Sequence, residues 1–221
     1  MVWILLIISL LISVIASISM RITFSKYKDV RNQSGITGAE AARQLLLANN
    51  ITDVQIEQLP GDLTDHYDPV SKTIRLSSDV YAKDTVAAVG VAMHEAGHAL
   101  QYAQDYAPAK VRSAIVKTTN ISSFASYILI MLGLVLSVRP LLDIGIWAFT
   151  IVIAFQLITL PVEFNASARA VGALRDMSIL NVEEQRGVRK VLTAAAMTYV
   201  AALVVSLLQL ARLLLIRNNS R

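Results

Sequence analysis

The 221-residue chain contains no cysteine, which excludes disulfides, cysteine zinc ligands and thiol catalysis. It also contains no Gly-x-x-x-x-Gly-Lys sequence, which excludes a P-loop nucleotide site. Charged residues are scarce at 16%, whereas hydrophobic residues make up 55% and the mean hydropathy is +0.55. These values exceed those of ordinary soluble chains, so we expect much of the apolar surface to face lipid.

The net charge of +4 and the isoelectric point near 9.4 are compatible with nucleic-acid binding or with basic membrane flanks. No nucleic-acid-binding motif occurs in the sequence. In a membrane protein, an excess of lysine and arginine marks the cytoplasmic flanks of the spans. We therefore expect a lipid bilayer as a partner, and neither nucleic acid nor nucleotide.

The stretch from Met93 to Leu100 holds two of the three histidines, His94 and His98, with Glu95 between them. On an α-helix the two histidines lie one turn apart on the same face, so their imidazoles can converge on one tetrahedral metal ion. Glu95 lies beside them, where its carboxylate can accept a proton from the attacking water and return it to a leaving amine. The metal that suits such ligands is Zn²⁺, one per chain.

A five-residue pattern with three fixed positions also arises by chance, so its context matters. The run from Asp84 to Met93 is long enough to form a helix that enters the motif, with Asp84 as a plausible N-cap. Burying these polar side chains in an apolar helix without a metal would be costly. Metzincins are excluded, because their glycine and third histidine are replaced here by Gln101 and Gln104.

Four apolar segments are long enough to cross a bilayer. The expected fold class is a mainly α membrane protein, in which a four-transmembrane-helix bundle carries a small α+β zincin-like catalytic domain. The predicted divisions are transmembrane helices at 1–20, 121–138, 144–162 and 194–216, the catalytic domain at 21–120, and a helical segment carrying the third zinc ligand at 163–193. Basic residues follow the first apolar run instead of preceding it, which favours an uncleaved anchor over a signal peptide.

Within the catalytic domain, residues 37–40 form a capping box that opens a helix. Alternation of apolar and polar residues predicts strands at 53–58 and 72–76, with a further extended piece at 65–69. The strand that runs into the zinc helix is expected to form the edge of the sheet, where a peptide substrate can pair. Pro108 is expected to close the zinc helix.

Glu163 is the leading candidate for the third zinc ligand. It begins a helical segment on which small residues share its face, namely Ala166, Ser167, Ala170 and Ala173. Small side chains allow another helix to approach closely, as a carboxylate that reaches a metal on a neighbouring helix requires. The alternative is that Glu163 is an interfacial charge at a helix end.

Three segments carry a resemblance to a known family: His-Glu-Ala-Gly-His-Ala-Leu-Gln at 94–101, Asp-His-Tyr-Asp-Pro at 65–69, and Glu-Phe-Asn-Ala-Ser-Ala-Arg-Ala at 163–170. In a chain with four apolar spans, this combination resembles the YugP-like family of neutral zinc metallopeptidases in bacterial membranes. The resemblance covers nearly the whole chain. It implies a membrane-embedded zinc endopeptidase of the gluzincin type, similar to the HtpX-like proteases, with membrane protein quality control as the associated role.

Carried onto this sequence, the resemblance implies zinc ligands at His94, His98 and Glu163 and a general base at Glu95. The chain departs from the pattern at one position. HtpX-like enzymes have an aspartate four residues after the glutamate ligand, whereas this chain has Ser167. The sequence therefore does not identify the residue that hydrogen-bonds and orients a histidine ligand.

Four further residues are candidates for contacts with the substrate or with the oxyanion formed during hydrolysis. They are His66 and Tyr67 in the extended piece, and Asn165 and Arg169 on the helix of Glu163. For His66 and Tyr67 the alternative is ordinary surface polarity. Arg169 falls on a different helix face from Glu163.

The segments 21–120 and 163–193 must share one side of the membrane if they supply ligands to one metal. They are rich in lysine and arginine, so the expected location is the bacterial cytoplasmic (inner) membrane, multi-pass, with a cytoplasmic catalytic face. The expected partners are a protein or peptide substrate and the bilayer. A zinc-stabilised scaffold or partner-binding protein without catalytic activity is the alternative function.

Overall fold

The computed structural model describes residues 2–61 and 64–219. The chain divides into two compact units. The first, called here the helical unit, comprises Met1–Ser17, Lys110–Pro161 and Met197–Arg221. The second, called here the mixed unit, comprises Ile18–Ala109 and Val162–Ala196 and contains all the predicted site residues.

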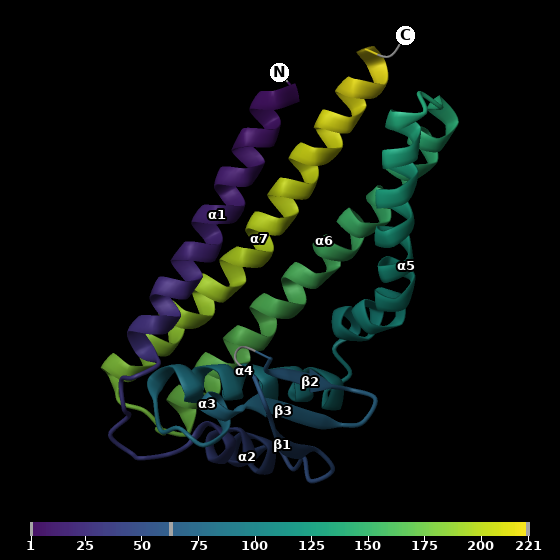
Figure 1. Ribbon diagram of the computed structural model, residues 1–221. Helices are drawn as coiled ribbons and strands as arrows, with labels where there is room; N and C mark the ends of the chain where they lie inside the picture. Colours follow the sequence, from purple (N-terminus) through teal and green to yellow (C-terminus); the bar gives the residue numbers. More distant parts are fainter. Residues whose placement is uncertain (1, 62–63, 220–221) are drawn as a thin grey trace. The chain divides into compact units, whose positions relative to one another are not determined.

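Four long helices confirm the predicted class of a mainly helical protein with four apolar helices. They are α1 (Val2–Tyr27), α5 (Ala107–Val135), α6 (Arg139–Asp176) and α7 (Val182–Asn219) (Figure 1). Each is long and apolar enough to cross a membrane. Pro108 lies in the first turn of α5, so it does not close the preceding helix, contrary to the sequence-based expectation. A proline fits there because the first turn of a helix does not need its missing N–H group.

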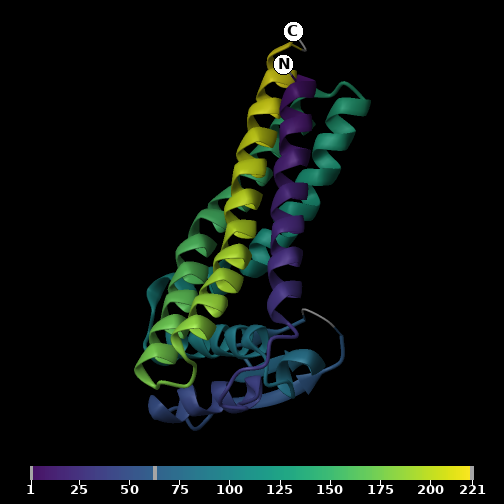
Figure 2. The same cartoon turned by 90° about the vertical axis from the view of Figure 1, so that its left-hand side faces the viewer.

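In the helical unit, α5 and α6 form a tight antiparallel hairpin. Gly133 of α5 approaches α6 so closely that an added Cβ atom would lie 2.5 Å from the backbone nitrogen of Leu142. The Arg217 guanidinium of α7 pairs with the Asp143 carboxylate of α6 at 2.6 Å. In Figures 1 and 2, the first turns of α1 and the last turns of α7 lie at the same end of this unit.

The mixed unit contains a three-stranded sheet in the order β1-β3-β2. Its shorter elements are α2 (Gly38–Ala48), β1 (Gln55–Leu59), β2 (His66–Asp68), β3 (Thr73–Ser77), α3 (Ser78–Tyr81) and α4 (Val86–Ala103). β1 pairs with β3 in parallel and β2 pairs with β3 antiparallel. The strand nearest the motif helix in sequence, β3, is therefore central, and the expectation that it forms the edge is wrong. The edges are β1 and β2.

Side-chain caps define where two helices of the mixed unit begin. The predicted capping box of α2 is confirmed, because the Glu40 carboxylate accepts a hydrogen bond from the Thr37 backbone at 2.9 Å while Glu40 N–H donates to the Thr37 hydroxyl. The predicted cap of α4 is wrong. Thr85 caps this helix by accepting from the backbone N–H of Ala88, and Asp84 instead pairs with Arg31 at 3.2 Å.

Helix α4 is the centre of the mixed unit. It packs against α2 and against the strands β2 and β3. Two glycines let other helices come close: Gly90 lies against Val188 of α7, and Gly97 lies against the backbone of Ala166 in α6. Most α4 residues are consequently buried, and polar groups on α4 are held in a largely apolar surrounding.

Candidate metal centre

His94 and His98 lie one turn apart on α4, as the spacing predicts. Their ring centroids are 4.7 Å apart and their planes are nearly perpendicular, at 84°. His98 is buried and His94 is half-buried. The helix is fixed on several sides by packing, so both imidazoles are presented from a rigid backbone.

Glu163 of α6 completes a cluster with the two histidines. Its Oε2 atom lies 3.3 Å from Nε2 of His94 and 3.7 Å from Nε2 of His98. The ligand-type atoms of the three residues all lie within 4.8 Å of one another, which allows them to hold one metal ion. Glu163 is only 2% exposed, and a carboxylate buried so deeply requires a compensating positive charge.

The distances from Glu163 to the two imidazoles fit zinc. Nitrogen and oxygen ligands lie about 2.0–2.1 Å from a tetrahedral zinc ion, so neighbouring ligand atoms are separated by about 3.3–3.4 Å. The two distances from Glu163 Oε2 to the imidazoles, 3.3 and 3.7 Å, are close to this value. Two imidazoles and one carboxylate are also a donor set that zinc accepts.

The small-residue face of α6 explains how Glu163 reaches the histidines. Ala166 and Ala170 on this face are fully buried. A Cβ atom added to Gly97 of α4 would lie 2.6 Å from the carbonyl oxygen of Ala166, so the two backbones are nearly in contact there. This close approach brings the carboxylate of Glu163 to the face of α4 that carries His94 and His98.

Each imidazole has a hydrogen-bonding partner on its other nitrogen. Nδ1 of His94 lies 3.1 Å from the Ser167 hydroxyl, and Nδ1 of His98 lies 3.0 Å from Oε1 of Gln101. Ser167 thus contacts a histidine from the position at which the HtpX-like pattern has an aspartate. Sequence reasoning missed Gln101, although its place three residues after His98 on the same helix face was a usable signal.

Glu95 also projects from α4 and is largely buried. Among the described residues, none donates a hydrogen bond to its carboxylate, so the oxygens remain available to a proton. Burial lowers the pKa of the His98 imidazole, but the neighbouring carboxylates of Glu163 and Glu95 outweigh this effect and hold that pKa above its usual value. The pair of carboxylates therefore gives the cluster a strong preference for positive charge.

Asp65, the first residue of the Asp-His-Tyr-Asp-Pro segment, lies in the loop before β2. The backbone N–H and the hydroxyl of Ser77 donate to its carboxylate at 2.7 and 3.0 Å. Burial raises the pKa of Asp65 and outweighs the hydrogen bonds from Ser77, which lower it. The negative charge of Glu95 raises this pKa further. The loop therefore brings a second acidic group into the electrostatic field of Glu95.

His66 and Tyr67, two of the candidates for substrate contacts, lie on the edge strand β2. His66 is exposed, and its Nδ1 atom lies 2.8 Å from the carbonyl oxygen of Thr64. The Tyr67 ring packs against that of Tyr102 on α4, with centroids 5.7 Å apart. Burial, with the charge of Asp53 as a smaller contribution, raises the pKa of Tyr67 to about 12, so its hydroxyl remains a hydrogen-bond donor.

The other two candidates, Asn165 and Arg169, contact the C-terminal end of α4. Nε of Arg169 donates to Oδ1 of Asn165 at 2.7 Å, and a further guanidinium N–H donates to the Gln104 side chain. Oδ1 of Asn165 also accepts from the Gln101 amide at 3.0 Å. These bonds connect both residues to the surroundings of His98.

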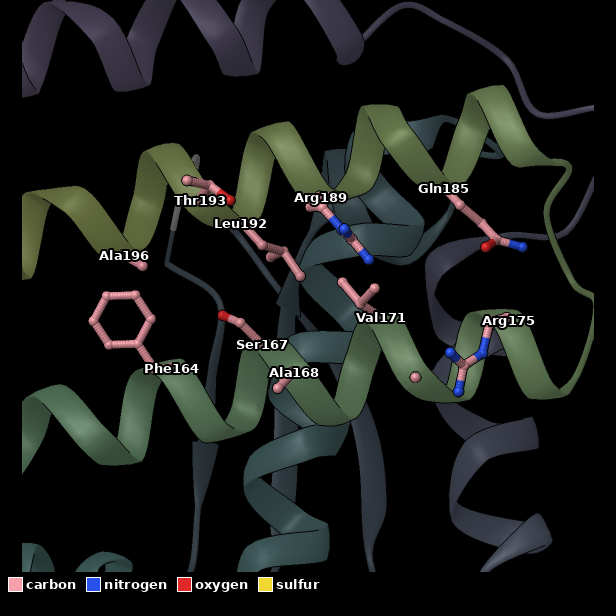
Figure 3. A pocket seen from close by; sticks show the side chains of 11 residues that line it. Phe164, Ser167, Ala168, Val171, Arg175, Gln185, Arg189, Leu192, Thr193 and Ala196 are labelled. Carbon is pink, nitrogen blue, oxygen red and sulfur yellow. The ribbon is translucent and has the colours of Figure 1, made fainter.

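A pocket of about 460 Å³ lies between α6 and α7 within the mixed unit (Figure 3). Phe164 and Ala196 line one end of it, and Arg175 and Gln185 line the other. Ser167 belongs to its wall. The hydroxyl that contacts His94 therefore borders this cavity.

Comparison with known proteins agrees with this cluster and with the apolar helices. Residues 2–218 match the profile of the family described as "putative neutral zinc metallopeptidase". The chain is similar to a Bacillus subtilis (strain 168) protein named "putative membrane protease YugP", with 44% identity over 206 residues, 93% of this chain and 92% of the relative. No solved structure matches the chain significantly. The profile match over almost the full length and the identity to this relative show that the chain belongs to the neutral zinc metallopeptidase family so described.

Proposed function

We propose that the protein is a membrane-embedded, zinc-dependent endopeptidase. The observation that carries this proposal is the convergence of His94, His98 and Glu163 within 4.8 Å, with Glu95 directly after His94 on α4. The four apolar helices and the family membership support a membrane protease. The fold around the site, a sheet and helices packed on α4, is the proposed zincin-like domain, built from residues 21–120 and 163–193.

In this proposal His94, His98 and Glu163 are the three protein ligands of one zinc ion, as in a gluzincin. Three protein ligands leave one tetrahedral position open, which distinguishes a catalytic zinc site from a structural one. Zinc bound there would polarise the scissile carbonyl and lower the pKa of water at the open position to about 7.

Glu95 is the proposed general base and acid. Its carboxylate accepts a proton as the water oxygen attacks the carbonyl carbon, and it then gives that proton to the amide nitrogen as the C–N bond breaks. Its position next to His94 in sequence, together with the lack of a donor to its carboxylate among the described residues, suits this role. A purely structural metal site would not need such a base.

The edge strand β2 is the proposed docking place for an extended peptide substrate. β2 contacts α4, and within the described parts of the chain β3 is its sole strand partner. A peptide can add to such an edge through backbone hydrogen bonds. Tyr67 and His66 on this strand are the proposed donors to the oxyanion, and Tyr67 is suited to it because its hydroxyl stays protonated.

The proposed substrates are unfolded or membrane-associated proteins at the bacterial cytoplasmic membrane, consistent with a role in membrane protein quality control. The catalytic face is proposed to be cytoplasmic, since the segments 21–120 and 163–193 carry most of the basic residues.

The test is metal analysis and cleavage of a labelled unfolded protein by the purified chain in detergent. The wild type is expected to carry one zinc per chain and to cleave the substrate. Glu95→Gln should keep the zinc and lose about 10²–10⁴-fold in rate, because the ligands remain and the proton acceptor is removed. Equal rates for the two proteins would refute the mechanism. Zinc binding without any cleavage by the wild type would favour the zinc-stabilised scaffold.

A further inference from the structure

Gln101 is a fully buried polar residue on α4, one turn after His98. Its side chain makes three hydrogen bonds. The Nε2 group donates to the Val162 carbonyl oxygen at 2.8 Å and to Oδ1 of Asn165 at 3.0 Å. The Oε1 atom lies 3.0 Å from Nδ1 of His98. Both the oxygen and the nitrogen of this amide therefore have partners. The orientation of the amide decides whether Nδ1 of His98 donates or accepts a hydrogen bond.

The chemistry of its partners fixes the orientation of the Gln101 amide. A backbone carbonyl such as that of Val162 can only accept, so the amide N–H₂ group must face it. The second partner gives the same answer independently. The Arg169 guanidinium can only donate, so the Asn165 atom that it contacts must be the oxygen, and this oxygen must receive an N–H from Gln101.

With the amide so oriented, its oxygen faces His98. An oxygen acceptor at 3.0 Å requires a hydrogen on Nδ1 of His98. In a neutral imidazole the other nitrogen, Nε2, then carries the lone pair. That nitrogen is the one facing Glu163 in the candidate metal cluster.

We propose that Gln101 is a positioning residue that holds His98 in the tautomer with hydrogen on Nδ1 and the lone pair on Nε2. Asn165 and Arg169 support it by fixing which way the amide points. In the opposite tautomer the lone pair of Nδ1 would face the Gln101 oxygen, and a buried hydrogen bond would be lost. The contribution of Gln101 to zinc binding rests on the proposed function. The tautomer of His98 follows from the hydrogen bonds of Gln101 and does not rest on the proposed function.

The chain is suited to a direct test because it contains only three histidines, His66, His94 and His98. The protein is labelled with ¹⁵N-histidine, and imidazole nitrogen shifts are recorded in detergent at a pH where the rings are neutral, with and without zinc. His98 signals are assigned from the spectra of His66→Gln and His94→Gln, each of which lacks the signals of one other ring. In the metal-free protein we expect the hydrogen of the neutral His98 ring on Nδ1. In the zinc form we expect the hydrogen to remain on Nδ1 and Nε2 to bind the metal.

Three variants separate positioning from simple packing. Gln101→Met keeps most of the volume but removes the acceptor, and should abolish the single His98 tautomer and weaken zinc binding about 10–100-fold in a chelator competition. Gln101→Glu should restore both readouts, because a buried protonated carboxyl can accept from His98 and donate to Val162. Gln185→Met is the matched control. It removes another amide whose Nε2 donates to a backbone carbonyl, that of Leu180, at 2.8 Å, and should change neither readout.

A neutral His98 ring with hydrogen on Nε2 and none on Nδ1 in the metal-free wild type would overturn the proposal, and this spectrum decides even if Gln101→Met does not fold. An unchanged tautomer and unchanged zinc affinity in Gln101→Met would also overturn it, whereas loss of thermal stability alone would show a packing role. If the wild type binds no zinc, the proposed function fails, but the tautomer of the metal-free protein still tests Gln101.

Discussion

The hydroxyl of Ser167 lies 3.1 Å from Nδ1 of His94, one turn along α6 from Glu163. The HtpX-like enzymes that this chain resembles have an aspartate at the corresponding position. Here a neutral hydroxyl supports His94, and the neutral amide of Gln101 supports His98. Among the described residues, neither histidine is therefore paired with a carboxylate through Nδ1, so no carboxylate polarises the N–H bond on that side of the ring.

This pairing predicts opposite effects for two substitutions of Ser167. Ser167→Ala removes the partner of His94 and should weaken zinc binding by about 10-fold. Ser167→Asp supplies a charged acceptor for the Nδ1–H group and should bind zinc more tightly than the wild type. Chelator competition on the purified proteins measures both. If Ser167→Asp weakens binding as much as Ser167→Ala, the hydroxyl does not act through His94.

Loss of the Glu163 carboxylate should have a larger effect on the metal than loss of any other acidic side chain on α6 or α7. Glu163→Ala leaves two imidazoles, and the zinc content after dialysis should fall from one per chain to near zero. Glu183→Ala is the control, because Glu183 is exposed and pairs only with Arg186 among the described residues. Glu184 is unsuitable, since its carboxylate accepts backbone hydrogen bonds from Gln33 and Asn181. Full zinc content in Glu163→Ala would require a different third ligand.

Two glycine substitutions test whether the close contact of α4 with α6 builds the site. An added methyl group at Gly97 would lie 2.6 Å from the Ala166 carbonyl oxygen, so Gly97→Ala must push α6 away. We expect a loss of about 1–3 kcal/mol in stability and a parallel loss of zinc affinity. Gly172→Ala, on α6 itself, meets nothing within 4 Å and should stabilise the helix by about 0.5–1 kcal/mol. Thermal unfolding in detergent, with and without zinc, measures whether each substitution lowers or raises the stability. Equal behaviour of the two variants would contradict the packing argument.

Features that depend on neighbouring residues were predicted well from the sequence. The capping box of Thr37 and Glu40 and the one-turn spacing of His94 and His98 are local, and both occur as predicted. The hydrogen bonds between Asn181 and Glu184 at the start of α7 are local in the same way. Residues in such patterns contact each other whatever the rest of the chain does, so periodicity and spacing are sufficient.

Features decided by tertiary contacts were predicted poorly. The central position of β3 follows from its pairing with both β1 and β2, which no pattern within β3 indicates. Asp84 had the right composition for a helix cap, but Arg31 engages its carboxylate. Gln101 has a role only because Val162 and Asn165 of α6 come within hydrogen-bonding distance of it. That contact joins residues more than sixty positions apart.

The membrane orientation is open to a direct test because the native chain has no cysteine. If four helices span the bilayer, the segments 21–120 and 163–193 lie on one side, and the turn at 136–138 lies on the other. Of the 20 lysine and arginine residues, only Arg139, Arg212, Arg217 and Arg221 fall outside the two segments. Basic residues near the ends of spans remain in the cytoplasm, so the segments that supply His94 and Glu163 should be cytoplasmic.

Single cysteines at Ser34 and Ser137 test this orientation in intact cells with a membrane-impermeant thiol reagent. Both side chains are exposed, Ser34 in the loop before α2 and Ser137 in the turn between α5 and α6. We expect labelling of Ser137→Cys on intact cells, and labelling of Ser34→Cys only after lysis, because the reagent reaches only the outer face. The native chain, which has no cysteine, is the control for background labelling. Labelling of Ser34→Cys but not of Ser137→Cys on intact cells would invert the orientation and place the candidate metal centre, and the peptides it meets, on the outer face of the membrane.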